Sequence, residues 1–275
     1  MAHNDEEPVI QRLIFGELVR QYREERGIEF SEAEQRLGGY GGKLSKVEGG
    51  TIGPDRNYVE SMIEFYKLDH WDADELRDLA IKARRRSSPK GVPSSSRRYV
   101  ALERVAAEIR MVYNEIPGLL QSTEFAHCML ARSPVLPSSD SYAQAEARQH
   151  RGDAVLREGG SDVRVVLGVE ALYREVGGPE VLARQLERLL ELIELPNVQI
   201  RIVPWSAGVV PGLGCPFTLL YIKPARKIAY VASLIRPDYI KATDAFTVAF
   251  NQAWELASSD DDSAEILKAR IAELS

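Results

Sequence analysis

The chain has 275 residues, more than one typical domain, and this length indicates two domains. Its 44% hydrophobic and 28% charged residues are typical of a globular protein, and no apolar run approaches the ~18 residues that cross a bilayer. The balance of 35 basic to 41 acidic residues, a net charge of −6, argues against a nucleic-acid-binding protein unless one face is locally basic.

The cysteine and histidine patterns predict no special chemistry. Cys128 and Cys215 lie far apart without a CxxC spacing, which predicts free thiols in the cytoplasm. The four histidines are scattered without ligand spacing, so we expect no metal site and no bound cofactor. The acidic, polar N-terminus is unlike a signal peptide.

Residues 9–26 are predicted to form the first helix, which ends at Gly27 because glycine readily adopts the left-handed cap conformation. The apolar positions recur every three to five residues, at Val9, Leu13, Leu18 and Tyr22. The opposite, solvent-facing side is expected to carry Arg20, Arg23, Glu24 and Glu25.

Residues 28–50 have the outline of a helix-turn-helix, two short helices joined by a glycine-rich turn. Ser31 and Glu34 have the spacing of a capping box that would start the second helix, which ends at Leu37. The third helix is expected to begin near Tyr40. It places Leu44 and Val47 on one face and Lys43 and Lys46 on another, a pattern that suits a groove-reading helix but also any surface helix.

Two further helices complete the predicted first domain, residues 1–86. Asp55 is expected to be the N-cap of the fourth helix, and Asp72 with Glu75 forms a second capping box that would start the fifth. Residues 87–98 then form a basic linker rich in serine and proline, which is either a solvated spacer or a strap that adds phosphate contacts.

Residues 99–275 mix helices and strands and are predicted to form an α+β domain on a small, mostly antiparallel sheet. Helices are expected at 99–111, 119–130, 142–156, 180–195, 245–256 and 263–274. Strands are expected at 163–169, 198–203, 217–222 and 227–233, the last two as a hairpin. The overall fold class is therefore α+β, with an all-α first domain.

No constellation of catalytic residues stands out, so we expect the chain not to be an enzyme. Ser122, Thr123 and His127 are close in sequence but lack the strand-turn-helix context of a nucleophile. The aromatic stripe Phe246, Phe250 and Trp254 is interpreted as core packing.

Two other features of the second domain leave alternatives open. Glu170 and Arg174, four residues apart, form either a weak ion pair or the polar rim of a pocket. Residues 211–214, Pro-Gly-Leu-Gly, form either a turn or a flexible lip over a binding surface.

The first domain resembles the XRE, or lambda-repressor-like, helix-turn-helix regulators. The similar landmarks are Gly27, the Leu37-Gly38 pair and the segment Val47-Glu48-Gly49-Gly50. The second domain resembles the C-terminal regulatory domain of actinomycete WhiJ-like regulators. It shares the ordered segments PGLLQ at 117–121, GGPE at 177–180, LPNV at 195–198, VPW at 203–205 and PFTLL at 216–220.

This resemblance implies a transcriptional regulator of development or secondary metabolism that binds double-stranded DNA as a homodimer. Such proteins are often encoded beside small partner proteins in an antitoxin-like arrangement, so a small acidic partner protein or a small-molecule effector is expected. The DNA-contacting residues that it implies are Tyr40, Gly41, Gly42, Lys43, Lys46 and Arg56. A regulatory pocket or partner surface would include Gln121, Glu170, Arg174, Trp205 and Phe217.

The chain departs from the family at the start of the third helix. Family members usually carry polar side chains there, whereas this chain has Gly41 and Gly42, and Glu34 replaces a small residue between the helices. The alternative function is a protein-interaction adaptor whose degenerate helix-turn-helix does not read DNA specifically.

Overall fold

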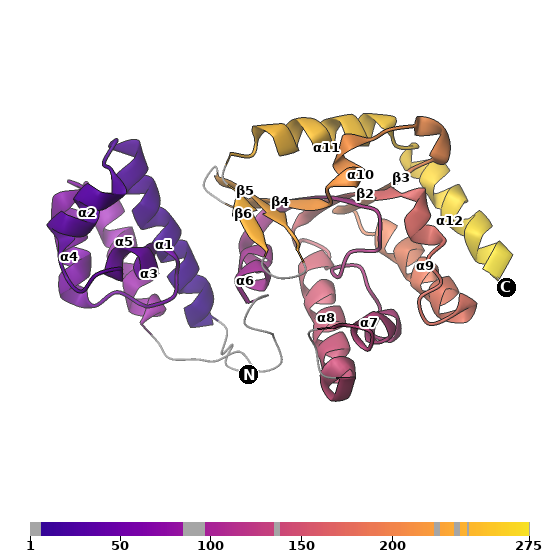
Figure 1. Cartoon of the computed structure of the whole chain (residues 1–275), viewed down its shortest axis with the longest axis horizontal. Coiled ribbons are helices and arrows are strands. Elements are labelled where there is room, and N and C mark those ends of the chain that lie inside the picture. The colour runs from indigo at the N-terminus through magenta and orange to yellow at the C-terminus, as the bar shows by residue number, and fades with distance from the viewer. Residues whose placement is uncertain are drawn as a thin grey trace. The chain divides into compact units, whose positions relative to one another are not determined.

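The structure is a computed structural model that describes residues 7–84, 97–134, 138–222, 226–233, 237–240 and 242–274 (Figure 1). These residues group into two compact units, and each is described by itself. Most of the expected linker lies outside the described residues, and α6 (Arg97–Val105) begins at its last two positions. The expected domain boundaries stay a prediction.

The first unit contains the five predicted helices. They are α1 (Glu7–Glu25), α2 (Phe30–Leu37), α3 (Lys43–Glu48), α4 (Arg56–Phe65) and α5 (His70–Ala83). Their inward faces share one core, which includes Phe15, Val19, Leu44, Met62 and Leu76. Helices this short depend on such packing, because isolated helices of this length are marginal in water.

Local capping signals in the first unit are partly confirmed. Gly27 has the expected positive φ of 63°, and the carboxylate of Asp55 accepts a hydrogen bond from the Tyr58 N–H as the N-cap of α4. The capping box expected for α5 is wrong, because the helix begins at His70. Its N-cap is Asp69, whose carboxylate accepts from the Asp72 N–H at 2.9 Å.

The second unit is built on a six-stranded mixed sheet with the strand order β3-β2-β1-β4-β5-β6. The strands are β1 (Ala106–Tyr113), β2 (Asp162–Gly168), β3 (Val198–Val203), β4 (Phe217–Ile222), β5 (Arg226–Val231) and β6 (Asp238–Ile240). The pairs β1–β2 and β2–β3 are parallel, and β1–β4, β4–β5 and β5–β6 are antiparallel. The predicted α+β class and the β4–β5 hairpin are confirmed.

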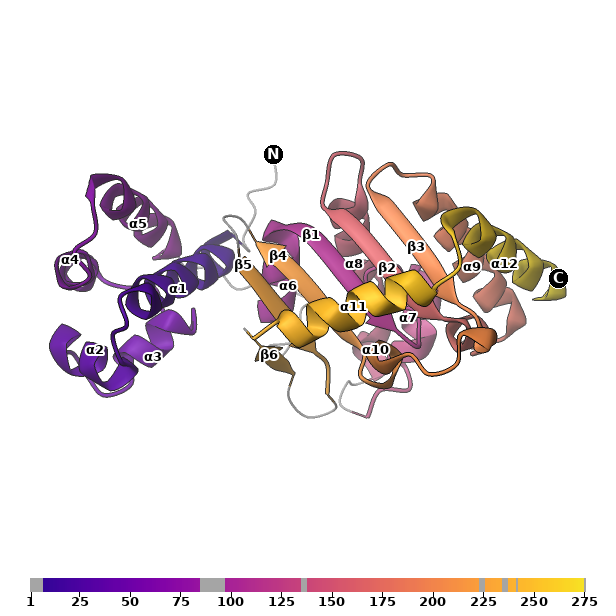
Figure 2. The same cartoon turned by 90° about the horizontal axis from the view of Figure 1, so that it is seen from above.

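Helices cover both faces of this sheet. The longer ones are α7 (Thr123–Leu130), α8 (Ser141–Leu156), α9 (Pro179–Ile193), α11 (Asp244–Leu256) and α12 (Asp260–Leu274). Short helices are α10 (Pro211–Gly214), η1 (Ser138–Asp140), η2 (Val169–Leu172) and η3 (Trp205–Ala207). Figure 2 shows α11 lying across the strands, and Figure 1 shows α8 and α9 on the other face. None of the described helices is both long and apolar enough to cross a membrane.

The aromatic stripe of α11 is core, as predicted. Phe250 is buried, and Phe246 and Trp254 pack against the same cluster. The ring of Phe246 meets that of Phe217 edge-on at 5.1 Å, and Phe250 stacks on Trp254 at 5.7 Å.

The main error in the predicted elements is at the start of the second unit. The helix expected over 99–111 ends at Val105, and the chain continues as β1 in the middle of the sheet. Pairing with β2 on one side and β4 on the other satisfies the backbone of β1, so tertiary contacts override the helical spacing of its side chains. Of the two alternatives for 211–214, the structure does not support the flexible lip, because the segment forms the single-turn helix α10 and a Cβ on Gly212 would meet Val112 and Phe217.

Candidate DNA-binding motif

Helices α2 and α3 and the turn between them form the candidate motif. The turn contains Gly38, Gly39 and Gly42, with φ angles of 64°, 103° and 80°. Residues with side chains rarely adopt such angles, so the sequence bends here because three glycines allow it. The backbone N–H of Lys43 closes the turn by donating to the Tyr40 carbonyl at 3.0 Å.

Glu34 stabilises this turn instead of capping α2. The expected capping box is wrong, because α2 begins at Phe30 and its N-cap, Glu29, makes no side-chain cap bond. The Glu34 carboxylate accepts a hydrogen bond from the Gly42 N–H at 2.8 Å, across the turn. The small residue buried in the core beneath α2 is Ala33, so Glu34 does not interrupt the packing.

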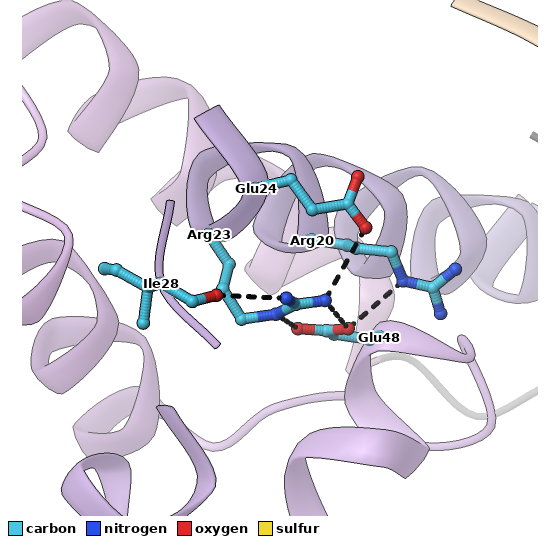
Figure 3. A network of polar contacts seen from close by, with 5 residues as sticks. All are labelled: Arg20, Arg23, Glu24, Ile28 and Glu48. Carbon is cyan, nitrogen blue, oxygen red and sulfur yellow. Dashed lines mark hydrogen bonds and ion pairs between the residues drawn. The ribbon is translucent and has the colours of Figure 1, made fainter. Parts of the chain in front are cut away.

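A buried ion-pair network fixes the C-terminal end of α3 against α1 (Figure 3). Arg23 donates from Nε to Glu48 Oε1 at 2.8 Å and from its terminal nitrogen to Oε2 at 3.1 Å. Arg20 donates to the same Oε2 at 3.1 Å, and Arg23 also reaches the carbonyl of Ile28. The hydrogen bond with Glu48 raises the pKa of Arg23 above its ordinary value.

Sequence reasoning missed this network because it placed Arg23 on the solvent side of the first helix. Arg23 is in fact buried, and so is Glu48. The backbones also approach closely, since a Cβ on Gly16 would lie 2.3 Å from the Val47 carbonyl oxygen. The only signal was the three-residue spacing of two arginines on α1, which does not reveal a partner on α3.

Lys43, a predicted DNA contact, is tied into the domain. Its ammonium nitrogen lies 2.9 Å from Asp55 Oδ2 and 3.9 Å from the centre of the Tyr58 ring, and its side chain is only 16% exposed. The hydrogen bond from Lys43 lowers the pKa of the Asp55 carboxyl, and burial raises the pKa of Tyr58 to about 12. Lys43 therefore links the start of α3 to the start of α4.

Tyr40 and Lys46 belong to the exposed part of the motif. Tyr40 is 55% exposed, and the ammonium nitrogen of Lys46 lies 5.0 Å from the centre of its ring. Gly41, between them in the turn, is also exposed. These residues can therefore contact a binding partner of the motif.

Arg56 is not part of that group. It lines a groove between α4 and α5 together with Arg77, Ile81 and Arg84. Arg77 is paired there with Glu60 at 2.8 Å, and Ile81 is exposed. Arg56 thus lies at the start of α4, next to the Asp55 that contacts Lys43, and its predicted DNA contact stays a prediction.

In the second unit, Gln121 and Phe217 are internal rather than part of an open pocket. Gln121 is buried and donates to the Ile116 carbonyl at 2.7 Å, while its own carbonyl accepts from Arg148 at 2.7 Å. Burial lowers the pKa of Arg148 to about 10. Phe217 belongs to the core beneath α11.

Two more glutamines hold the same loop after β1. Gln185 of α9 accepts from the Ser122 N–H at 2.7 Å and donates to the Leu120 carbonyl at 3.0 Å. Gln149 of α8 accepts from both the N–H and the hydroxyl of Thr123. The PGLLQ segment is thus held as a scaffold by side chains that satisfy its backbone.

The other three expected pocket residues are less buried than Gln121 and Phe217. Glu170 is half-buried in η2, and its carboxylate folds back over Gly168. Since η2 ends at Leu172, Arg174 is not on the same helix, and no ion pair joins it to Glu170 in the part of the chain that the structure describes. Trp205 is 69% exposed in η3. The regulatory pocket or partner surface stays a prediction.

Comparison with known families assigns both parts of the chain. Residues 14–79 match a helix-turn-helix domain, which spans α2, the glycine turn and α3 and supports a DNA-binding regulator in general. No curated protein and no solved structure matches the chain. Residues 96–269, more than half of the sequence, match a domain of unknown function (DUF5753), and the chain belongs to this family.

Proposed function

We propose that this protein is a transcriptional regulator of the XRE type, whose first unit docks on double-stranded DNA. The observation that carries the proposal is a helix-turn-helix with an open outer side, Tyr40 and Lys46, and an inner side fixed by Glu48 and Arg23. A rigid second helix suits groove recognition, because the reading residues must be held in place before they meet the bases. The match of residues 14–79 to a helix-turn-helix domain supports the same role.

The second unit is proposed to sense a small molecule or to bind a partner protein, without catalysing a reaction. The order of its sequence motifs supports a WhiJ-like regulator that is paired with a small acidic protein in an antitoxin-like arrangement. We further propose that the protein acts in the cytoplasm as a homodimer on a two-fold site, since dimeric helix-turn-helix proteins bind paired half-sites.

Selection of bound genomic fragments by the full-length protein, followed by sequencing, tests the DNA-binding role. A regulator enriches fragments that share a palindromic motif with half-sites about one helical turn apart. Enrichment without any shared motif, or no enrichment, contradicts it. Binding should be measured at several salt concentrations, because phosphate contacts make the affinity strongly salt-dependent.

The second candidate is a protein-interaction adaptor, and two contacts favour it. The ammonium group of Lys43 is engaged by Asp55, and the carboxylate of Glu34 lies in the turn, so the motif offers few free cations to phosphates. An adaptor gives no DNA motif in the same selection and instead forms a stoichiometric complex with a partner protein. The two candidates therefore predict opposite results from one purified sample.

A further inference from the structure

Nothing within the chain explains why residue 41 in the turn is a glycine. Gly38, Gly39 and Gly42 have positive φ angles, but Gly41 does not. A Cβ built on Gly41 would meet no atom of the described residues within 4 Å. Neither the backbone nor the packing of the chain requires the absence of a side chain at this position.

An exposed aromatic ring lies next to this bare stretch of backbone. Tyr40 is 55% exposed, one of two large apolar side chains exposed among the described residues of the first unit, the other being Ile81 of the α4–α5 groove. Lys46 places its ammonium nitrogen 5.0 Å from the centre of the Tyr40 ring. Tyr40 and Gly41 therefore form an apolar surface with a cation beside it, which we call the Tyr40–Gly41 surface.

The turn makes its Gly42 amide unavailable to a phosphate group, which leaves Lys46 as the phosphate contact beside this surface. The carboxylate of Glu34 occupies the Gly42 N–H at 2.8 Å and places a negative charge beside the turn. An apolar surface next to a carboxylate fits an uncharged, apolar part of DNA. In the major groove that part is the 5-methyl group of thymine.

We propose that the Tyr40–Gly41 surface packs against thymine methyl groups in the major groove, and that Gly41 lacks a side chain so that the backbone can approach the base edges. This inference rests on the proposed DNA-binding function. Under this inference, the turn recognises bases through apolar contact, because neither Gly41 nor Gly42 has a side chain that could form a hydrogen bond.

The first arm of the test changes the DNA and leaves the protein unaltered. The probe is the fragment bound most tightly in the genomic selection, with each thymidine replaced in turn by deoxyuridine, which removes only the methyl group. We expect one or two positions to weaken binding of the full-length chain about fourfold, as for the burial of one methyl group. With Tyr40→Ala, the same positions should lose their effect.

The second arm changes the protein. Gly41→Ala should weaken binding about tenfold, because an added methyl group overpacks a close interface. Its thermal midpoint should equal or exceed that of the wild type, since replacing a glycine in an ordinary conformation restricts the unfolded chain. Gly214→Ala is the matched control, because Gly214 is also exposed, lacks a positive φ and has nothing within 4 Å of a built Cβ.

The possible outcomes distinguish the methyl-contact inference from the proposed DNA-binding function. Wild-type affinity for every deoxyuridine fragment, or for Gly41→Ala, overturns the methyl-contact inference while leaving DNA binding intact. Failure of the wild-type chain to select any DNA overturns the proposed function and this inference together. The deoxyuridine series uses the unaltered chain, so a negative result overturns the inference independently of how any variant folds, and Tyr40→Ala assigns a positive result to this surface.

Discussion

Arg23 and Glu48 lie 25 residues apart in the sequence and join α1 to the end of α3 through a two-pronged ion pair, with Nε 2.8 Å from Oε1. The side chain of Glu48 is only 2% exposed, so its charge depends on Arg23 and Arg20 for compensation. The pair therefore sets the position of the helix that is proposed to enter the groove.

Replacing Glu48 with glutamine should destabilise the first unit strongly. The change removes the buried carboxylate that Arg23 and Arg20 share, and breaking a buried pair typically costs about 3–5 kcal/mol. Hydrogen exchange of peptides from α1 to α5, measured at increasing urea concentrations, gives the loss in free energy of unfolding of the first unit. Glu24→Gln is the control on the same network. Glu24 is 51% exposed and 3.6 Å from Arg23, so its removal should cost less than about 1 kcal/mol. Equal effects of the two variants would contradict a structural role for Glu48.

The contact between Lys43 and Asp55 should be visible in the titration of Asp55. Because Lys43 lowers the pKa of this carboxyl, the contact stabilises the fold above the unfolded pKa of about 4 and is lost as the pH falls through the folded value. Lys43→Met should raise the Asp55 midpoint toward its ordinary value, as measured by carbon-detected NMR. An unchanged midpoint would mean that the ion pair is absent in solution. Lys46→Met is the control, and it should leave Asp55 unaffected.

The loop after β1 should depend on Gln185 for its stability. Gln185→Ala leaves the Ser122 N–H without its side-chain partner, and an unsatisfied buried group costs about 1–3 kcal/mol, whereas the Leu120 carbonyl keeps its hydrogen bond from Arg188 at 3.2 Å. The neighbouring variant Arg184→Ala removes only an exposed ion pair with Glu124 and should leave the thermal midpoint nearly unchanged. A lower thermal midpoint for Gln185→Ala than for Arg184→Ala would show that Gln185 holds the loop. Equal midpoints would show that the loop does not depend on it.

The features that the sequence predicts well are those set by neighbouring residues. The left-handed cap at Gly27 and the N-cap at Asp55 depend on groups within three or four positions, and both are confirmed. The strand at β3 alternates visibly because one face is buried. The α+β class follows from such local signals taken together.

The features that the sequence misses depend on partners far along the chain. Glu34 has the spacing of a capping box, but its partner is the Gly42 N–H across the turn. β1 has helical spacing, yet two flanking strands hold it extended. Gln121 was expected at a pocket because it belongs to a distinctive motif, whereas the structure uses it to satisfy buried backbone groups. A motif alone does not distinguish a ligand site from a scaffold.

The two lysines of α3 should respond differently in a salt series. Lys46 is exposed beside Tyr40, so Lys46→Ala should weaken DNA binding and reduce the slope of log affinity against log salt by about 1, the loss of one phosphate contact. Lys43 is held by Asp55, so Lys43→Met should leave this slope unchanged even if affinity falls through a loosened α3. Fluorescence anisotropy of a labelled fragment at four or more salt concentrations measures both slopes. A reduced slope for Lys43→Met would show that Lys43 leaves Asp55 and contacts phosphate in the complex. An unchanged slope for Lys46→Ala would remove Lys46 from the phosphate contacts and leave the exposed side of the motif to Tyr40 and Gly41.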